Sequence, residues 1–413
     1  MSLAIASVAA VAMCPTTENL VLVKVQTSEP GLYGWGCATY TQRYSAVLEI
    51  VRTYLEPLLV GRDPARVSEL WRLMHTNGYW RSGPVVNNAI SGVDQALWDI
   101  KGKQAGMPVY DLLGGKVREA AEVYQHAAGR DAEELRDRAA ALVEQGVRNV
   151  RVQLSKDPHA AGDLAAATAG YGGASLSGAA PDGALPGDYY DPAAYRHTTI
   201  EAIARVREML GDDVGLVHDV HSRLSPAEAV DFARQLEPFG LLFLEDALPP
   251  EHLDWYERLR AATTTPQAVG ELFVHPAEWL PLVKSGLIDF LRLHVSAIGG
   301  LTPAWRAAQV CETHGVRTAW HGPKDVSPVG HAAQLHLDVA SHAFGIQEFP
   351  SFSEPEAEIF DGLPALRDGY LYPSDRAGLG IDVDERASTR YPARAAVVGW
   401  TQSRRRDGSL SFP

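Results

Sequence analysis

The stretch VGLVHDVH, residues 214–221, reads as a short apolar strand that ends in charged side chains. The runs LLFLED and AVGEL follow the same plan further along the chain. Asp219, Glu245 and Glu271 lie within the last three residues of these runs, and each carboxylate follows the previous one by 26 residues. Because this interval is about the length of one β/α unit, we expect the three side chains at equivalent positions on adjacent parallel strands.

The same alternation of strand and helix extends over residues 121–360. Strands are predicted at 122–127, 148–153, 214–221, 241–247, 267–272, 290–295, 317–322 and 344–349. Helices are predicted at 131–145, 198–210, 226–237, 251–262, 276–285, 302–314 and 328–340. Eight such units predict the α/β class and a modified (β/α)₈ TIM-like barrel. An open, doubly wound sheet is the alternative, and it is disfavoured because no glycine-rich phosphate turn follows a strand.

The segments around the barrel have a different character. Residues 1–120 combine strand-like runs with helical patterns at 44–60 and 87–105, which predicts an α+β capping domain. The insertion at 155–197 is rich in Gly, Ala, Pro and Asp, and it fits either a disordered segment or a lid over the barrel mouth. The segment 361–413 is rich in turns, and we expect it to return to the capping domain.

Composition narrows the class of protein. The 413 residues are 46% apolar and carry a net charge of −14, which argues against nonspecific binding to nucleic acid. No apolar run is long enough to span a membrane, so we expect no membrane partner. The apolar start leads directly into the strand-like LVLVKVQT without an earlier Lys, so we interpret it as a strand, not a signal peptide. The three cysteines form neither a zinc pattern nor a disulfide framework, which favours the cytoplasm. We expect the basic cluster at 404–406 to be a solvated surface.

The three strand-end carboxylates predict a metal site. Anions held together are costly unless a cation binds between them, and oxygen ligands suit Mg²⁺. Side chains alternate along a strand, so Asp219 and His221 are expected to face the barrel mouth while His218 faces the helices. By the same rule Asp246 is expected to face away from Glu245. Further polar residues end other predicted strands, and they are His126, Arg151, Gln153, His294, His321 and Glu348.

Several motifs make the chain similar to the enolase superfamily. The carboxylate pattern and the capping segments resemble the superfamily as a whole. The motifs YWRSGPV, VYQHAAG, HDVHSR and especially TAWHGPKDVSPVGHAAQLHLD are similar to its mannonate dehydratase subgroup. The resemblance implies a Mg²⁺-dependent dehydratase, a lyase that converts an aldonate such as D-mannonate or D-gluconate to a 2-keto-3-deoxy sugar acid. It also implies a homo-oligomer, either a dimer or an octamer.

The resemblance also implies roles for individual residues. Asp219, Glu245 and Glu271 would hold Mg²⁺, and His221 would protonate the leaving hydroxyl. Arg151 would pair with a tyrosine of the following loop as the base. The expected further contacts to the substrate come from His126, Gln153, His321, Asp325 and Glu348.

Some positions depart from the family pattern. Tyr171 precedes a Gly as the pattern requires, but it lies 20 positions after Arg151, so Tyr189, Tyr190 and Tyr195 stay open as alternatives. Thr41 stands where many members have Asn, Lys324 enters the usual GPGD motif, and the chain ends in SLSFP without a Trp. These departures keep two alternatives open. One is another enolase-type reaction on a different carboxylate, and the other is a binding protein with little or no turnover.

Overall fold

The computed structural model describes residues 3–155, 182–183, 185, 189–395 and 403–411. Tertiary contacts divide the chain into two compact units. The first unit comprises Met1–Glu122, Gly270–Leu280 and Leu291–Ala395. The second comprises Val123–Val269, Pro281–Phe290 and Ala396–Pro413.

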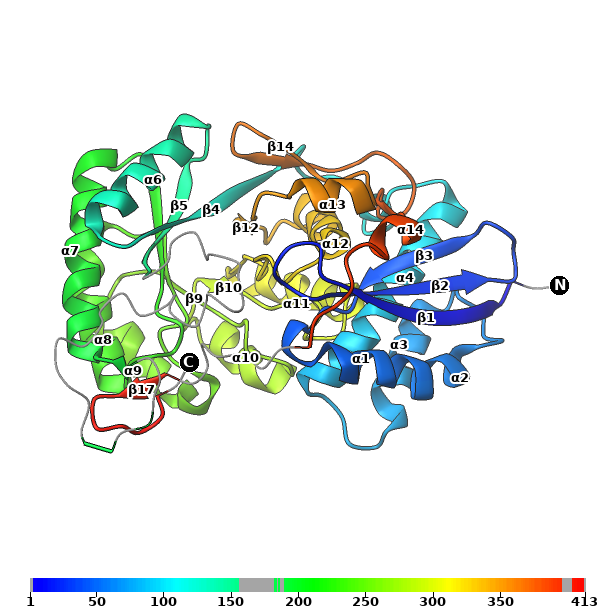
Figure 1. Cartoon of the computed structure of the whole chain (residues 1–413), viewed down its shortest axis with the longest axis horizontal. Helices are drawn as coiled ribbons and strands as arrows, with labels where there is room; N and C mark the ends of the chain where they lie inside the picture. Colours follow the sequence, from blue (N-terminus) through cyan, green and yellow to red (C-terminus); the bar gives the residue numbers. More distant parts are fainter. Residues whose placement is uncertain (1–2, 156–181, 184, 186–188, 396–402, 412–413) are drawn as a thin grey trace. The chain divides into compact units, whose positions relative to one another are not determined.

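The first unit begins with an antiparallel sheet in the order β1-β2-β3. Its strands are β1 (Ile5–Met13), β2 (Leu20–Thr27) and β3 (Tyr33–Cys37). The helices that follow are α1 (Tyr44–Ile50), a π-helical turn at Val51–Leu55, α2 (Glu56–Leu59), α3 (Val67–Asn77), α4 (Pro84–Ala105) and α5 (Val109–Leu112). Helices α1 and α4 pack on the sheet (Figure 1). A Cβ at Gly92 would lie 2.4 Å from the Val23 side chain, so only glycine allows this close approach of α4 to β2.

The later part of the first unit consists of short strands and helices. They are α11 (Leu301–His314), β11 (Arg317–Thr318), α12 (Pro328–Ala340), β12 (Gln347–Glu348), α13 (Glu354–Ile359), β13 (Phe360–Asp361), β14 (Ala365–Arg367), β15 (Tyr370–Tyr372), β16 (Asp382–Val383) and α14 (Glu385–Ser388). Asp382 accepts hydrogen bonds from the Tyr33 hydroxyl at 2.6 Å and the Trp35 indole at 2.9 Å. The amide side chain of Asn19 donates to the Arg394 carbonyl at 2.7 Å. Residues of the C-terminal segment up to Arg394 therefore contact the N-terminal sheet and the residue before β2.

The second unit contains five parallel strands, each connected to the next through a helix. In the order of their pairing the strands are β4 (Ala121–Gly129), β5 (Asn149–Leu154), β7 (Gly215–Asp219), β8 (Phe243–Glu245) and β9 (Gln267–Val269). The helices are α6 (Ala132–Glu144), α7 (Pro192–Leu210), α8 (Pro226–Leu236) and α9 (Tyr256–Ala262). The elements α10 (Pro276–Lys284) and β10 (Phe290–Leu291) follow. The repeated β/α unit predicted from the sequence is thus present, although most strands are shorter than predicted.

Two predictions from the sequence, one about a barrel helix and one about the C-terminal segment, differ from the structure. Helix α7 begins at Pro192, not at 198, because Asp191 caps it through the amides of Ala193 and Ala194. The last described residues do not continue along the N-terminal sheet. Instead, β17 (Arg404–Arg405) pairs in parallel with β6 (Tyr189–Tyr190) of the second unit. This pairing satisfies backbone groups at the edge of a two-residue strand that would otherwise face solvent.

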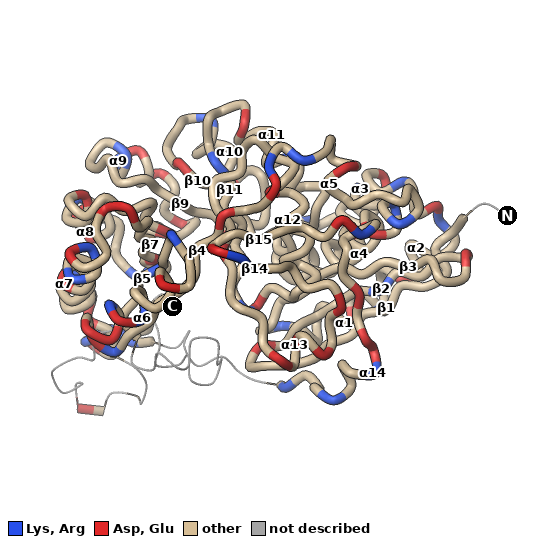
Figure 2. The backbone as a smooth tube through the Cα atoms, turned by 90° about the horizontal axis from the view of Figure 1, so that it is seen from above, with Lys and Arg blue, Asp and Glu red and all other residues tan. Residues whose placement is uncertain are grey.

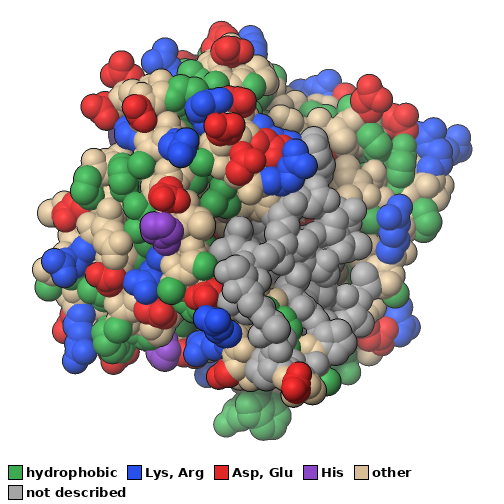
Figure 3. Space-filling view, turned by 60° about the vertical axis from the view of Figure 1, so that its left-hand side comes forward, with side chains coloured by type: hydrophobic (Ala, Val, Ile, Leu, Met, Phe, Trp, Pro, Cys, Tyr) green, Lys and Arg blue, Asp and Glu red, His purple; other side chains and the backbone are tan. Residues whose placement is uncertain are grey.

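The charged side chains lie mainly on solvated surfaces. Figure 2 shows acidic and basic residues along α6, α7 and α8, as expected for helices that bury one face. Charges of both signs are interspersed over the face seen in Figure 3, and Arg405 is exposed. Among the residues that the structure describes, none of the helices combines the length and the apolar character needed to cross a membrane.

Candidate active site

A cluster of three carboxylates lies at the ends of β7 and β8 in the second unit. Asp219 and Glu245 are the last residues of these strands and are paired in the parallel ladder. Asp246 follows Glu245, and one oxygen from each of the three residues lies within 4.8 Å of the others. All three side chains are buried. The ladder register explains the closeness of Asp219 and Glu245, because the carboxyl ends of parallel strands meet at one edge.

The position of Asp246 contradicts the prediction from strand alternation. Its φ is +41°, a left-handed conformation that breaks the alternation of the two faces. Its amide still donates to the Ala268 carbonyl at 2.9 Å, so the backbone turns while it remains attached to β9. Asp246 therefore joins the cluster, and the prediction that it faces away from Glu245 is wrong.

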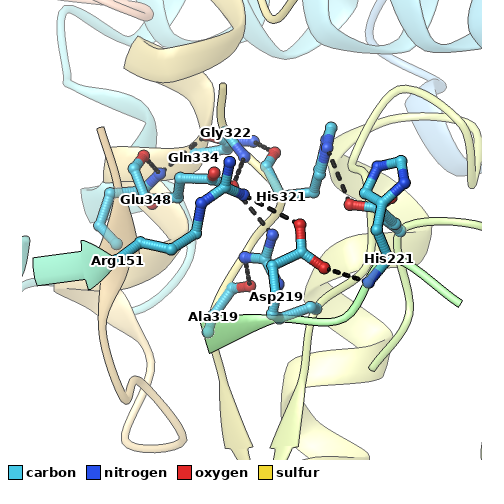
Figure 4. A network of polar contacts seen from close by, with 11 residues as sticks. Arg151, Asp219, His221, Ala319, His321, Gly322, Gln334 and Glu348 are labelled. Atoms are coloured by element: carbon cyan, nitrogen blue, oxygen red, sulfur yellow. Dashed lines mark hydrogen bonds and ion pairs between the residues drawn. The ribbon is translucent and has the colours of Figure 1, made fainter. Parts of the chain in front are cut away.

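Arg151 on β5 contacts the cluster. Its Nη1 lies 3.1 Å from Asp219 Oδ2, and both side chains are buried (Figure 4). Gln153 lies two residues further along the strand and is also buried, and its Oε1 has no hydrogen-bond partner within the described part of the chain. His126 on β4 is the ladder partner of Arg151 and stacks on the ring of Tyr124. Arg151 and His126 are therefore neighbours in the sheet.

His221 lies beyond the end of β7, where strand alternation does not apply. Its φ is +57°, and so is that of Ser222. The His221 amide donates to Asp219 Oδ1 at 2.7 Å (Figure 4). The amides of Val220 and Ser222 donate to the carbonyls of Glu245 and Asp246 at 2.9 and 2.8 Å. These backbone bonds, not the pleat of a strand, connect His221 to the carboxylate cluster.

His218 faces away from the cluster, as predicted. Its Nε2 lies 2.8 Å from the Tyr195 hydroxyl, and its Nδ1 lies 2.9 Å from the Val152 carbonyl. Burial lowers the pKa of His218 to about 4, so the ring is neutral at neutral pH.

Four tyrosines were candidates for the base that pairs with Arg151, and the structure describes three of them. Tyr171 itself lies outside the described residues. The Tyr189 hydroxyl donates to the Leu185 carbonyl at 2.9 Å, and the Tyr195 hydroxyl is hydrogen-bonded to His218. Burial raises the pKa of Tyr190, and its hydroxyl has no hydrogen-bond partner among the residues the structure describes. Among the described residues, none of these three hydroxyls is hydrogen-bonded to Arg151, which is the partner that the expected base requires.

A second polar cluster lies in the first unit. His321 Nε2 lies 3.2 Å from Glu271 Oε2, and the rings of His294 and His321 stack at 5.0 Å. Ligand atoms of His294, His321 and Asp325 lie within 4.8 Å of one another. Burial lowers the pKa of His321, but the charges of Glu271, Asp325 and Glu348 outweigh it and raise this pKa to about 9. Burial raises the pKa of Asp325.

The first unit also holds a buried ion pair whose cation the sequence did not single out. Arg292 Nη2 lies 2.9 Å from Glu348 Oε2, and both side chains are almost completely buried. The Gly322 amide donates to the same oxygen at 2.8 Å, and Gln334 donates to the His321 carbonyl at 2.7 Å (Figure 4). A lone Arg between the apolar residues of FLRLHV is the signal that could have revealed Arg292, because a buried charge needs a partner.

Family models match most of the chain. Residues 134–387 match the enolase C-terminal domain-like family, and residues 5–114 match the N-terminal domain of mandelate racemase and muconate lactonizing enzyme. The chain belongs to the enolase superfamily. The prediction of this superfamily, and of its fold with a capping domain and a (β/α) barrel-like domain, is therefore confirmed.

Known members of the superfamily resemble the chain over its whole length. A D-galactonate dehydratase family member from Enterococcus gallinarum is 46% identical over 413 residues, covering 100% of this chain and 99% of the relative. Another from Catenulispora acidiphila is 48% identical, covering 100% and 94%. The crystal structure of an enolase from Pantoea ananatis with bound D-gluconate and Mg is 44% identical, with a TM-score of 0.96 and full coverage of both chains. The chain thus belongs to the D-galactonate dehydratase family of the enolase superfamily, whose name denotes a lyase.

Proposed function

We propose that this protein is a Mg²⁺-dependent acid-sugar dehydratase acting on a six-carbon aldonate such as D-mannonate or D-gluconate. The buried cluster of Asp219, Glu245 and Asp246, in contact with Arg151, is the observation that carries the proposal. The relative from Pantoea ananatis, which binds D-gluconate and Mg, supports both the metal and the substrate class.

The donor set fits a hard divalent cation. Three buried carboxylates this close repel one another strongly, and a divalent cation between them would offset that repulsion. Carboxylate oxygens are the ligands that Mg²⁺ prefers. We propose Asp219, Glu245 and Glu271 as ligands, the last because of its place two residues after β9. Asp246 is within reach as a further oxygen donor.

The proposed reaction is an elimination from the aldonate. When bound, Mg²⁺ supplies positive charge that stabilises the enediolate form of the substrate carboxylate. The phenolate of Tyr171, stabilised by the guanidinium of Arg151, would take the proton from the carbon next to the carboxylate, and the C–H electron pair would move toward that carboxylate. His221 donates a proton to the β-hydroxyl as its C–O bond breaks, so that water leaves. The enol product then becomes the 2-keto-3-deoxy acid.

The remaining polar residues would bind and orient the sugar. His126 on β4 and Gln153 on β5 lie on neighbouring strands near Arg151, and the Gln153 oxygen, which has no hydrogen-bond partner among the described residues, suits a sugar hydroxyl. His321, whose ring lies beside Glu271, would contact an oxygen of the substrate. Asp325 and Glu348 would accept hydrogen bonds from hydroxyl groups.

The test is an assay of the purified protein with Mg²⁺ on a panel of aldonates that includes D-mannonate, D-gluconate and D-galactonate, with detection of the 2-keto-3-deoxy product. We expect one substrate to be converted and the activity to disappear with EDTA and return with Mg²⁺. D219N should be inactive, while the matched control D213N, an exposed carboxylate before β7, should keep full activity. Lack of product from every aldonate would contradict the proposal, and α-proton exchange without elimination would favour a different superfamily reaction.

A further inference from the structure

The strands β5 and β7 are held together in two different ways along their length. Their backbone ladder pairs Asn149 with Gly215, Val150 with Leu216 and Arg151 with Val217. One residue beyond the last pair, the His218 side chain bonds to the Val152 carbonyl at 2.9 Å. A side-chain bond thus continues the connection between the strands beyond the paired residues, next to Arg151 and Asp219.

We propose that Tyr195 and His218 form a positioning pair that holds the ends of β5 and β7 at the spacing required by Arg151 and Asp219. The contacts lie on consecutive residues of both strands. On one face Arg151 contacts Asp219 at 3.1 Å, and on the other His218 contacts the carbonyl of Val152. A shift of β5 relative to β7 would strain both contacts together.

The two hydrogen bonds of His218 define the tautomer of its ring and the direction of its bond with Tyr195. A carbonyl oxygen only accepts, so Nδ1 of His218 carries the hydrogen that Val152 receives. In the neutral ring Nε2 is then an acceptor, and the Tyr195 hydroxyl at 2.8 Å is its donor. Every polar atom of the imidazole is thereby satisfied, although both side chains are buried.

Aromatic packing fixes the two rings from the helical side. Phe232 of α8 lies with its ring centroid 5.7 Å from that of Tyr195 and 5.9 Å from that of His218. Tyr195 itself comes from α7, one turn after the cap at Asp191. The pair therefore connects helix α7 to both strands, and we infer that it acts on the metal ligand through the backbone without touching substrate.

The predicted effect of the pair on turnover rests on the proposed function, but its effect on metal binding does not. The test therefore begins with metal binding in the absence of substrate. Mn²⁺ binding without substrate is measured for the wild type, Y195F, H218N, H218L and Y190F. Groups that orient metal ligands typically contribute about 10–100-fold in affinity, and we expect Y195F and H218L to weaken Mn²⁺ binding by about 10-fold. In H218N the amide nitrogen can still donate to Val152, but the shorter side chain has no atom that reaches Tyr195, so we expect a loss similar to that of Y195F. Y190F, which removes a neighbouring buried hydroxyl without a described partner, should change affinity by less than about twofold.

The same variants separate a positioning role from a general loss of stability. We expect Y195F to lower kcat at saturating Mg²⁺ with little change in KM. A variant that was only less stable would keep the wild-type kcat at temperatures well below its Tm. Mn²⁺ affinities equal to that of Y190F in Y195F and H218L would overturn the inference. If the wild type binds Mn²⁺ but converts no aldonate, the proposed function fails while the affinities still test the pair. A wild type that binds no divalent cation would overturn both.

Discussion

The backbone amide of His221 donates a hydrogen bond to Oδ1 of Asp219 at 2.7 Å. This contact lies in a left-handed turn formed by His221 and Ser222, directly after β7 ends. The imidazole of His221 is therefore attached to a proposed metal ligand through the main chain.

His221→Asn should separate the metal site from the elimination step. Asn tolerates the left-handed conformation and keeps the amide bond to Asp219, so we expect Mg²⁺ affinity to stay within about threefold. Loss of a general acid typically lowers the rate by about 10²–10⁴-fold, and we expect dehydration to fall by at least 100-fold. Isothermal titration and product assays measure the two effects. A larger loss of dehydration in H218N than in H221N would show that the assignment of the acid is wrong.

Asp246→Asn should test whether the residue contributes to the metal site. Asn adopts the left-handed conformation readily, so the Tm should change by only a degree or two. We expect Mg²⁺ affinity to fall by about 10-fold, since an anionic oxygen within 4.8 Å of Asp219 and Glu245 is removed. Titration of the variant with Mg²⁺ measures this affinity. An affinity equal to that of the wild type would show that Asp246 does not contribute to cation binding.

Arg292→Met should be strongly destabilising. Removing one partner of a buried ion pair typically costs about 3–5 kcal/mol, because the other charge stays buried. Glu348 keeps its bond from the Gly322 amide, so we expect a loss near the lower end of this range. The free energy of unfolding from urea titration measures the effect. The double variant R292M/E348Q should lose less than the two single losses added together, and strict additivity would mean that the pair is not coupled.

Asp94→Asn should remove a pH dependence of stability from the first unit. Burial raises the pKa of Asp94 from 3.8 to about 7, although Thr302 donates to its oxygens at 2.8 and 2.5 Å. A raised carboxyl pKa means that the stability it confers is complete below about pH 4 and is lost as the pH rises through 7. We therefore expect the wild type to lose up to about 4 kcal/mol relative to D94N over this range.

Paired Tm measurements of the wild type and D94N between pH 5 and 8 test this prediction. The Asn side chain can accept from the Thr302 amide and donate to its hydroxyl, so D94N should fold normally. A difference in Tm that stays constant over the whole range would contradict the prediction. If the Tm of the wild type rose relative to that of D94N with increasing pH, the pKa of Asp94 would be lowered by folding instead of raised.

The sequence by itself determined the superfamily, the repeated β/α unit and the pairing of Asp219 with Glu245. It could do so because these features depend on regular intervals, and parallel strands bring equivalent positions to one edge. The same regularity oriented His218 correctly, since that residue lies within β7. The roles assigned to the individual site residues remain predictions.

Only the tertiary structure decided the features that depend on irregular backbone or on distant partners. The positive φ of Asp246 brings it into the carboxylate cluster, and that of His221 replaces the expected strand by a turn. Arg292 and Glu348 are 56 residues apart, and Tyr195 and His218 are 23 apart, so no local pattern marks either pair. Local periodicity specifies which face a side chain takes in a regular strand. Once the strand ends, the turn conformation and the partners supplied by other elements decide where the side chain lies.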